Sequence, residues 1–173
     1  MKRILCVGIL MALLTGCASQ QTFETITDVQ DQPVEAQMQQ VLLELPPGAQ
    51  LQTMEPDSTD KLYLCNGFTV CLQTIQSGDL DKTLRAVTGY GEEELTLMQT
   101  TTAEGTRYRC VWAAAGEGQT QVGKTCIVDD GRYHYALTVM VPEETAGELS
   151  QTVATVMDSF QVVDAELNLN TGS

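Results

Sequence analysis

Basic residues and histidine are scarce in this chain. Nine Lys and Arg residues stand against 23 Asp and Glu residues, which gives a formal net charge of −14 at pH 7. Nucleic acids and anionic lipid headgroups are bound through clusters of Lys and Arg, so this composition argues against both as partners. The only histidine, His134, falls within a predicted strand as a structural or solvated residue. No Ser-His-Asp or Cys-His catalytic set can be argued around it.

Long apolar runs and paired cysteine motifs are also missing. A helix that spans a bilayer needs about 20 apolar residues, and the apolar segment 4–14 is shorter than that. It follows Lys2 and Arg3 and ends in small residues, a layout that is typical of a secretory signal. No Cys-x-x-Cys spacing occurs, which argues against a structural zinc site.

The apolar segment closes with Leu14-Thr15-Gly16-Cys17, which resembles the lipobox of bacterial lipoproteins. In that family a peptidase cuts before the cysteine after its thiol has received a diacylglycerol. The resemblance implies that residues 1–16 are a signal peptide and that Cys17 carries the lipid. Two acyl chains hold a protein stably at a membrane, so we expect a lipid-anchored protein on the extracytoplasmic face of the cell membrane. An ordinary signal peptide with a coincidental cysteine is the alternative.

Composition divides the remaining chain into three parts. Residues 17–40 are rich in Gln, Thr, Glu and Asp, and such a weakly hydrophobic stretch predicts a flexible tether behind the acylated cysteine. Residues 41–164 have the length of a single folded domain, and residues 165–173 are expected to form a disordered tail. The apolar run at 41–45, before Pro46 and Pro47, favours a strand over a helix.

Turn and cap signals within the domain predict mixed structure. Asn66-Gly67 between two β-rich runs predicts a hairpin that places residue 65 opposite residue 68. Residues 77–89 fit a helix, with Ser77 or Asp79 as N-cap and Gly89 at its left-handed end. Strands are expected at 95–99, 106–114, 122–128 and 133–141, followed by a helix at 143–158 and a short edge strand at 161–163. This order predicts the α+β class, with an antiparallel sheet of about six strands and helices packed on its faces.

Four cysteines remain beyond the signal and Cys17, and the expected compartment permits disulfides. They are Cys65, Cys71, Cys110 and Cys126. A hairpin centred on Gly118 would place Cys110 directly opposite Cys126, and this register predicts a possible Cys110–Cys126 disulfide. The Asn66-Gly67 register points Cys65 and Cys71 to opposite faces, so a bridge between them would need a distorted loop. Buried free thiols are the alternative.

One segment imitates a nucleotide-binding motif. Residues Gly118 to Thr125 match the phosphate-loop pattern G-x-x-x-x-G-K-[ST]. That loop works because it opens a helix whose N-terminal amides hold the phosphates. Here the residues after Thr125 predict a strand, so we interpret the match as coincidental and expect no nucleotide ligand.

Two acidic runs are further candidate sites. Glu92-Glu93-Glu94 is predicted to be a solvated turn, and a cation-binding site is the more specific alternative. Asp129-Asp130-Gly131 is predicted to be a hairpin turn and lacks the ligand spacing of a calcium loop.

Aromatic residues are expected to gather on one face of the sheet. Tyr108, Cys110 and Trp112 alternate onto one side of their strand. The Asp130-Gly131 turn would set Tyr135 opposite Cys126 and so bring the tyrosines of the next strand to the same side. Core packing is the preferred interpretation, and an aromatic groove for a ligand or peptide is the alternative.

The domain as a whole resembles the PsbP-like sandwich proteins. The residues that carry the resemblance are Leu43-Glu44-Leu45-Pro46, Tyr108-x-Cys-x-Trp112, the Asp130-Gly131 hairpin with Tyr133 and Tyr135, and the closing helix that runs into Asp158-Ser159-Phe160. The resemblance implies an antiparallel sheet covered by helices on both faces and a role in binding other proteins or assisting their assembly. It brings no shared catalytic residues.

These observations together predict a cell-envelope lipoprotein without enzymatic activity or cofactor. We expect it to bind an envelope protein or a small ligand. A cation-binding envelope lipoprotein and a surface hydrolase that uses acidic residues are the alternatives.

Overall fold

The computed structural model describes residues 38–52, 59–102, 105–115 and 118–163. Cys17, with the rest of the lipobox and most of the predicted tether, lies outside the described residues, as does the tail at 165–173. The first described strand, β1 (Gln40–Leu42), begins one residue before the run 41–45 that was predicted to favour a strand, and it covers the first two residues of that run.

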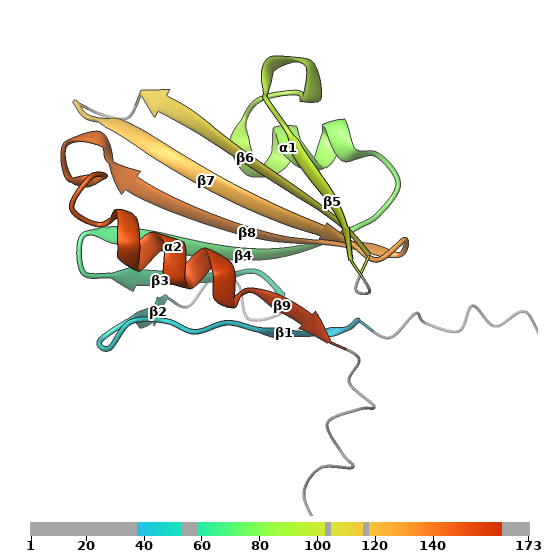
Figure 1. Ribbon diagram of the computed structural model, residues 1–173, viewed down its shortest axis with the longest axis horizontal. Helices are drawn as coiled ribbons and strands as arrows, with labels where there is room; N and C mark the ends of the chain where they lie inside the picture. Colours follow the sequence, from blue (N-terminus) through green and yellow to red (C-terminus); the bar gives the residue numbers. More distant parts are fainter. Residues whose placement is uncertain (1–37, 53–58, 103–104, 116–117, 164–173) are drawn as a thin grey trace, which may run out of the picture. The chain divides into compact units, whose positions relative to one another are not determined.

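Seven strands form one antiparallel sheet, with β2 at one edge and β5 at the other (Figure 1). In spatial order they are β2 (Gln50–Gln52), β3 (Lys61–Cys65), β4 (Phe68–Gln76), β8 (Tyr133–Pro142), β7 (Thr120–Asp129), β6 (Gly105–Ala115) and β5 (Met98–Thr102). The predicted Asn66-Gly67 hairpin is confirmed, because Cys65 pairs with Phe68 and Gly67 has a φ of +86°. Strand β2 was not expected from the sequence.

Two helices cover opposite faces of this sheet, α1 (Leu80–Thr88) and α2 (Ser150–Ser159) (Figure 1). The caps predicted for α1 are confirmed. The Asp79 carboxylate accepts a hydrogen bond from the Lys82 amide at 3.3 Å, and Gly89 ends the helix with a φ of +83°. These local signals fix the ends of α1, since each satisfies main-chain groups that the helix leaves unpaired.

Two expected elements start later than predicted, and a 3-10 turn precedes each of them. η1 (Glu92–Glu94) precedes β5, which begins at Met98. η2 (Glu143–Thr145) precedes α2, which becomes a regular helix only at Ser150. Gly147 lies between η2 and α2, and glycine costs about 1 kcal/mol in a helix interior.

Each helix packs on its own hydrophobic cluster. The α2 face buries a cluster that includes Val70, Leu137, Val139, Val153 and Phe160. The α1 face buries a smaller cluster of Leu84, Cys110, Trp112, Ile127 and Ala136. Successive strand residues alternate between the two, as pleated geometry requires. The predicted α+β class, with helices on both faces of an antiparallel sheet, is therefore confirmed, with seven strands in the main sheet.

A second, small sheet pairs the beginning of the described chain with its end. In it, β1 runs antiparallel to β9 (Gln161–Val163), and Gln40 lies opposite Val163. The edge strand expected at 161–163 is thus confirmed. The amide of Gln39 also donates a hydrogen bond to the Tyr135 hydroxyl at 2.8 Å, which fastens this end of the chain to the main sheet.

The predicted Cys110–Cys126 register is wrong by one residue. Cys110 pairs with Thr125, and Cys126 pairs with Arg109. A slip of one residue moves a side chain to the other face of a sheet, so Cys110 belongs to the α1-face cluster and Cys126 to the α2-face cluster. Both are free thiols, and the expected disulfide is absent.

The register predicted from the Asp130-Gly131 turn is wrong by two residues. Cys126 pairs with Leu137, and Tyr135 pairs with Val128. Tyr135 therefore stays on the same face as Cys126, in the α2-face cluster. Tyr108 packs with the α1-face cluster, so the two sets of aromatic residues do not share a face.

Candidate binding groove

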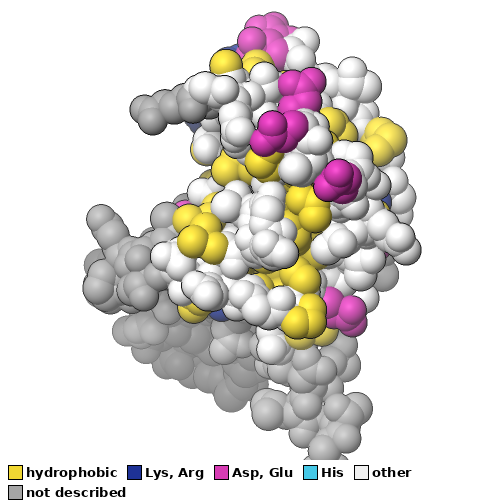
Figure 2. All heavy atoms as spheres, turned by 90° about the vertical axis from the view of Figure 1, so that its left-hand side faces the viewer, with side chains coloured by type: hydrophobic (Ala, Val, Ile, Leu, Met, Phe, Trp, Pro, Cys, Tyr) yellow, Lys and Arg dark blue, Asp and Glu magenta, His cyan; other side chains and the backbone are white. Residues whose placement is uncertain are grey.

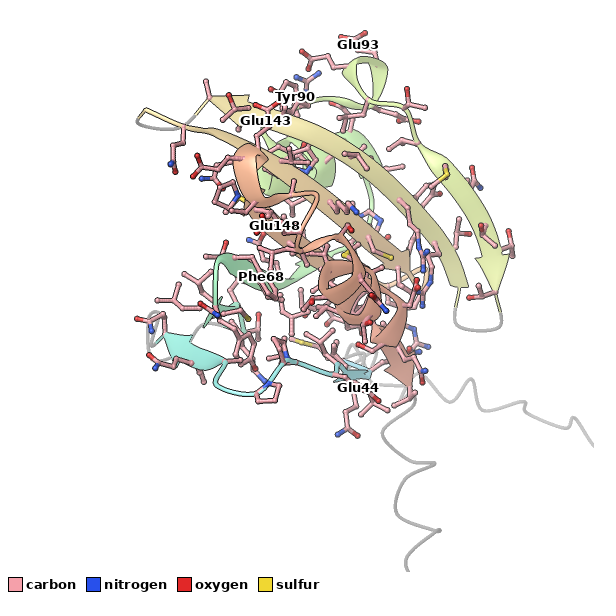
Figure 3. The ribbon with its side chains drawn as sticks, turned by 60° about the vertical axis from the view of Figure 1, so that its left-hand side comes forward. Glu44, Phe68, Tyr90, Glu93, Glu143 and Glu148 are labelled. Atoms are coloured by element: carbon pink, nitrogen blue, oxygen red, sulfur yellow. The ribbon has the colours of Figure 1, made fainter. Side chains whose placement is uncertain are left out.

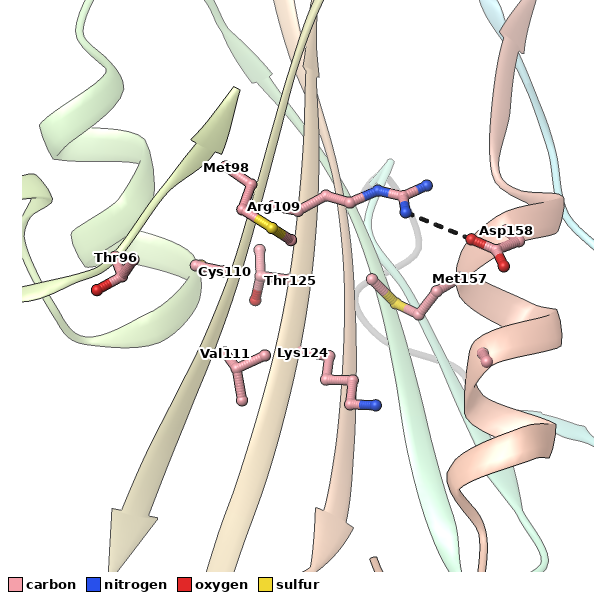
Figure 4. A pocket seen from close by; sticks show the side chains of 10 residues that line it. Thr96, Met98, Arg109, Cys110, Val111, Lys124, Thr125, Met157 and Asp158 are labelled. Carbon is pink, nitrogen blue, oxygen red and sulfur yellow. Dashed lines mark hydrogen bonds and ion pairs between the residues drawn. The ribbon is translucent and has the colours of Figure 1, made fainter. Parts of the chain in front are cut away.

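A groove lies on the α2 side of the sheet, where β5 and β6 extend beyond the cover of α2 (Figure 4). Its volume is about 440 Å³. Side chains from three strands and from α2 line it, among them Met98, Arg109, Val111, Lys124, Met157 and Asp158. A neighbouring hollow of about 630 Å³, lined by Thr100, Thr102, Arg107 and Phe160 among others, shares Met98, Arg109 and Asp158 with it. The two together form one surface along β5, which we call the α2-side groove.

Strand register explains which side chains form the floor of the α2-side groove. Met98 lies opposite Arg109, and Val111 lies opposite Lys124. Directly opposed residues point to the same face, so the floor combines apolar and cationic side chains. Met98 is 63% exposed and Val111 is 59% exposed. These are the two most exposed of the large hydrophobic residues in the described part of the chain.

Two of the groove cations are held by residues at the C-terminal end of α2. Both terminal nitrogens of Arg107 donate to the main-chain oxygen of Phe160 at 3.1 Å, and the guanidinium lies 5.7 Å from the centre of the Phe160 ring. Arg109 Nη1 lies 3.4 Å from Asp158 Oδ1 (Figure 4). Within the described residues Lys124 makes no ion pair, so its charge faces the groove uncompensated.

The chain as a whole carries the opposite charge. Arg107, Arg109 and Lys124 are three of only nine basic residues in a chain with 23 acidic ones. On the face drawn in Figure 2 acidic side chains are spread over the surface and basic ones are scarce. Figure 3 shows that acids such as Glu44 and Glu93 stand at opposite ends of the domain. The groove is therefore a local basic surface on an acidic protein.

The sequence contains one signal for this groove, which lies in the strand β6. Arg107, Arg109 and Val111 alternate along β6 and thus share a face. The alternate residues Tyr108 and Trp112 were predicted to pack in the core, with an aromatic groove as the alternative. These pack with the α1-face cluster, which confirms the preferred interpretation of them as core.

His134 is a structural residue, buried to 2% exposure. Its Nδ1 lies 2.7 Å from Thr83 Oγ1, and its Nε2 lies 3.2 Å from Ser77 Oγ and 3.5 Å from Asp129 Oδ2. The sequence did not predict this meeting of Ser, His and Asp. In a hydrolytic triad the serine and the aspartate bind opposite ring nitrogens, whereas here both approach Nε2. The cluster joins α1 to the β7–β8 hairpin.

The two acidic runs are engaged in local hydrogen bonds and ion pairs. Glu94 accepts a hydrogen bond from the Gly91 amide at 2.8 Å and lies 3.4 Å from Arg85. Arg85 also pairs with Asp81 at 2.9 Å, and these contacts make the Glu92–Glu94 run a turn, as predicted. Asp130 accepts a hydrogen bond from the Arg132 amide at 2.7 Å, which confirms the hairpin turn.

The segment that matches the phosphate loop is a strand, as predicted. Residues from Thr120 onward belong to β7, and Gly123 lies opposite Trp112. A Cβ at position 123 would overlap three ring atoms of Trp112. The second glycine of the pattern is therefore explained by the close approach of an indole ring to the main chain.

The four described cysteines are free thiols. Burial raises the pKa of the Cys110 thiol to about 11. Burial also raises the pKa of Cys126, although the nearby Arg107 and Arg109 oppose that shift. A raised pKa keeps a thiol protonated and unreactive at neutral pH, so both cysteines act as small core residues.

The described residues contain no group of three or more His, Cys, Asp and Glu side chains that could hold a metal ion. Of the helices that the structure describes, none has the length and apolar character needed to cross a bilayer.

Comparison with known proteins gives similarity of structure only. The sequence matches no family model and no curated protein. The chain is similar to a mutant form of the protein Mog1, at 16% identity and a TM-score of 0.47, over 73% of this chain and 93% of that one. Similar values hold for the Ran-binding protein Mog1p of Saccharomyces cerevisiae, with 16% identity, a TM-score of 0.47, and coverage of 73% and 92%. This chain is also similar to LpqN, which is involved in cell envelope biogenesis of Mycobacterium tuberculosis. The identity is 12% and the TM-score is 0.43, over 71% of this chain and 83% of LpqN.

Proposed function

We propose that this protein is anchored by a lipid on Cys17 to the extracytoplasmic face of the cell membrane, and that its domain binds a protein or a small ligand without transforming it. The α2-side groove is the binding site. One observation carries the proposal, namely the gathering of Arg107, Arg109 and Lys124 beside exposed apolar side chains on an acidic protein.

The chemistry of the groove supports binding rather than catalysis. Ligand sites are concave, mostly apolar surfaces of about 300–1,000 Å³ with a few placed polar groups, and the groove has this character. Hydrolysis by acidic residues needs two carboxyl groups across the scissile bond. Asp158 is the one carboxylate that lines the groove in the described part of the chain, and it is paired with Arg109.

Site-specific photocrosslinking in intact cells tests the binding site. A photoreactive residue placed at Val111, which is 59% exposed, is expected to give one discrete adduct. The matched control is Lys82 on α1, whose side chain is 83% exposed on the opposite side of the sheet. An adduct from position 111 and none from position 82 supports the groove. Equal adducts from both positions, or none from position 111, would contradict it.

Acylation of Cys17 is tested by replacing it with serine. We expect the Cys17→Ser protein to incorporate no labelled palmitate, since the oxygen cannot take the place of the thiol in lipidation of the lipobox cysteine. The mass of the mature chain and its palmitate content are the measurements.

The matched control is Cys65→Ser, because Cys65 is a partly exposed free thiol within the domain. This variant is expected to be labelled like the parent protein. Full labelling of the Cys17→Ser variant would show that the lipid is carried elsewhere and would remove the anchor from the proposal.

A further inference from the structure

Strand β5 is an unprotected sheet edge beside the α2-side groove. It pairs with β6 on one side, and no strand of the described chain pairs with its other side. An edge strand offers unpaired N–H and C=O groups, and proteins guard such edges with charge, proline or bulges. The sequence of β5, Met-Gln-Thr-Thr-Thr, contains neither charge nor proline, and all five residues are exposed. Its pairing with β6 runs without a bulge from Met98 to Thr102.

The opposite edge of the sheet differs in length. Strand β2 has three residues, whereas β5 has five. Very short edges are one of the protections that proteins use. Only β5 combines length, neutrality and exposure with an adjoining groove.

We propose that an extended acidic segment of a partner protein adds to the sheet as a strand beside β5, with alternate carboxylates directed to Arg107 and Arg109. This inference rests on the proposed function of the α2-side groove and names its occupant. Main-chain hydrogen bonds to an exposed edge supply affinity in such complexes, and side-chain pockets on alternate residues supply specificity.

The geometry of the sheet allows these charges to meet. Met98 and Thr100 point to the groove side and lie opposite Arg109 and Arg107 of β6. A strand added outside β5 stands two strand spacings from β6, which is roughly 9.5 Å. A glutamate on the added strand and an arginine on β6 can close that distance across the short Thr100 side chain. The partner's residues on the other face would point away from the groove.

Charge decides between an acidic segment and a second copy of this chain. A second copy paired through its own β5 would bring no carboxylate toward Arg107 and Arg109, because β5 is Met-Gln-Thr-Thr-Thr, and it would add its own arginines to a surface that is already basic. An acidic segment brings carboxylates to Arg107 and Arg109 instead. Asp158, the carboxylate that lines the groove in the described part of the chain, pairs with Arg109 at 3.4 Å and would compete with the segment for that cation.

A capped synthetic peptide in which glutamate alternates with valine is the probe, titrated calorimetrically against the whole purified chain in neutral detergent. We expect saturable binding that weakens with added salt, because exposed charge pairs are screened. The same peptide with lysine in place of glutamate is the matched control and is expected not to bind. Equal binding of both peptides would overturn the proposal.

Two substitutions in the groove change binding in opposite directions. Arg109→Glu is expected to weaken binding of the glutamate peptide roughly three- to thirtyfold, from one lost charge pair and one new repulsion. Asp158→Asn is expected to tighten it about two- to fivefold, since it frees Arg109 from its internal partner. Unchanged affinity in both variants, with unchanged melting temperatures, would overturn the proposal.

Neighbouring proline substitutions test pairing at the edge itself. Along an antiparallel strand the N–H groups point alternately toward the partner strand and away from it. One of Thr100→Pro and Thr101→Pro therefore removes an outward donor and leaves the fold stable, while the other breaks a bond to β6. The stable variant is expected to bind the peptide at least about fivefold more weakly. Full binding by that variant would overturn the proposal.

The crosslinking and peptide experiments together distinguish a failure of the proposed binding site from a failure of the proposed occupant. If position 111 still crosslinks in cells while the glutamate peptide does not bind, the groove is a binding site with a different occupant, and the inference about β5 fails alone. Sedimentation of the chain as a dimer that the stable proline variant abolishes would identify a second copy as the occupant and would also overturn the inference.

Discussion

Replacing Phe160 with alanine is expected to lower the free energy of unfolding by about 3–5 kcal/mol, the usual cost of removing a buried aromatic side chain. Phe160 is fully buried in the α2-face cluster, at 0% exposure. Its ring also lies under the Arg107 guanidinium, and its main-chain oxygen accepts two hydrogen bonds from that group. The variant therefore loses core packing and the ring contact with one groove cation, while the main-chain oxygen stays as an acceptor for Arg107.

Urea unfolding checks this value, with far-ultraviolet circular dichroism and tryptophan fluorescence as two probes. Trp112 is the single tryptophan of the chain and packs with the α1-face cluster. Coincident transitions would show that both faces unfold together. The matched control is Val111→Ala at an exposed position, for which we expect a change within about 0.5 kcal/mol. A loss below about 1 kcal/mol for Phe160→Ala would mean that α2 does not depend on this contact.

Replacing Gly123 with valine is expected to destabilise the domain by roughly 3 kcal/mol or more. A side chain at this position must displace the Trp112 ring, with which its Cβ would overlap. Trp112 Nε1 donates to Thr125 Oγ1 at 2.9 Å, and Thr125 Oγ1 lies 3.0 Å from Thr138 Oγ1. The substitution therefore adds steric strain and leaves buried polar groups without a partner.

Gly147→Ala is the control for the Gly123 variant, because an added Cβ at Gly147 meets no atom within 4 Å. It is expected to melt at the temperature of the parent protein. A double variant that combines Gly123→Ala with Trp112→Leu should lose less stability than the two single changes added together, since removal of the indole relieves the overlap. Strict additivity in this cycle would refute the contact as the reason for the glycine.

Local signals in the sequence predicted those parts of the fold that short-range chemistry determines. Asn66-Gly67 fixed the β3–β4 register because both turn positions accept positive φ. Asp79 and Gly89 fixed the ends of α1 because each satisfies main-chain groups at a helix terminus. In these cases a residue pair or a cap determines the geometry without help from distant segments.

The strand registers across the longer β6–β7 and β7–β8 connections were predicted wrongly by the same reasoning. Ala115 pairs with Thr120, so the β6–β7 connection has an even number of residues and is not centred on Gly118. That shift of one residue separated Cys110 from Cys126 and removed the expected disulfide. No composition rule distinguishes the two registers, because both place apolar residues on both faces of a sheet that is buried on both sides.

The α2-side groove could be predicted only in part. The alternation of Arg107 and Arg109 along β6 is visible in the sequence, and it indicates a basic strip on one face. The groove itself needs Asp158 and Met157, which reach the strip from a helix far away in the chain. Whether α2 covers β5 and β6 or stops short of them depends on packing, which no local pattern encodes.

The pairing of β1 with β9 has a practical consequence for engineering. Because Gln40 lies beside Val163, a short linker could join the two ends, and neighbouring ends are what makes circular permutation tolerable. New termini opened between β6 and β7 would emerge at the other end of the sheet (Figure 1). Under the proposed anchor at Cys17, a leader fused there instead would attach the domain to a bilayer by its other end, so the direction in which the basic surface is displayed becomes a variable that can be set by design.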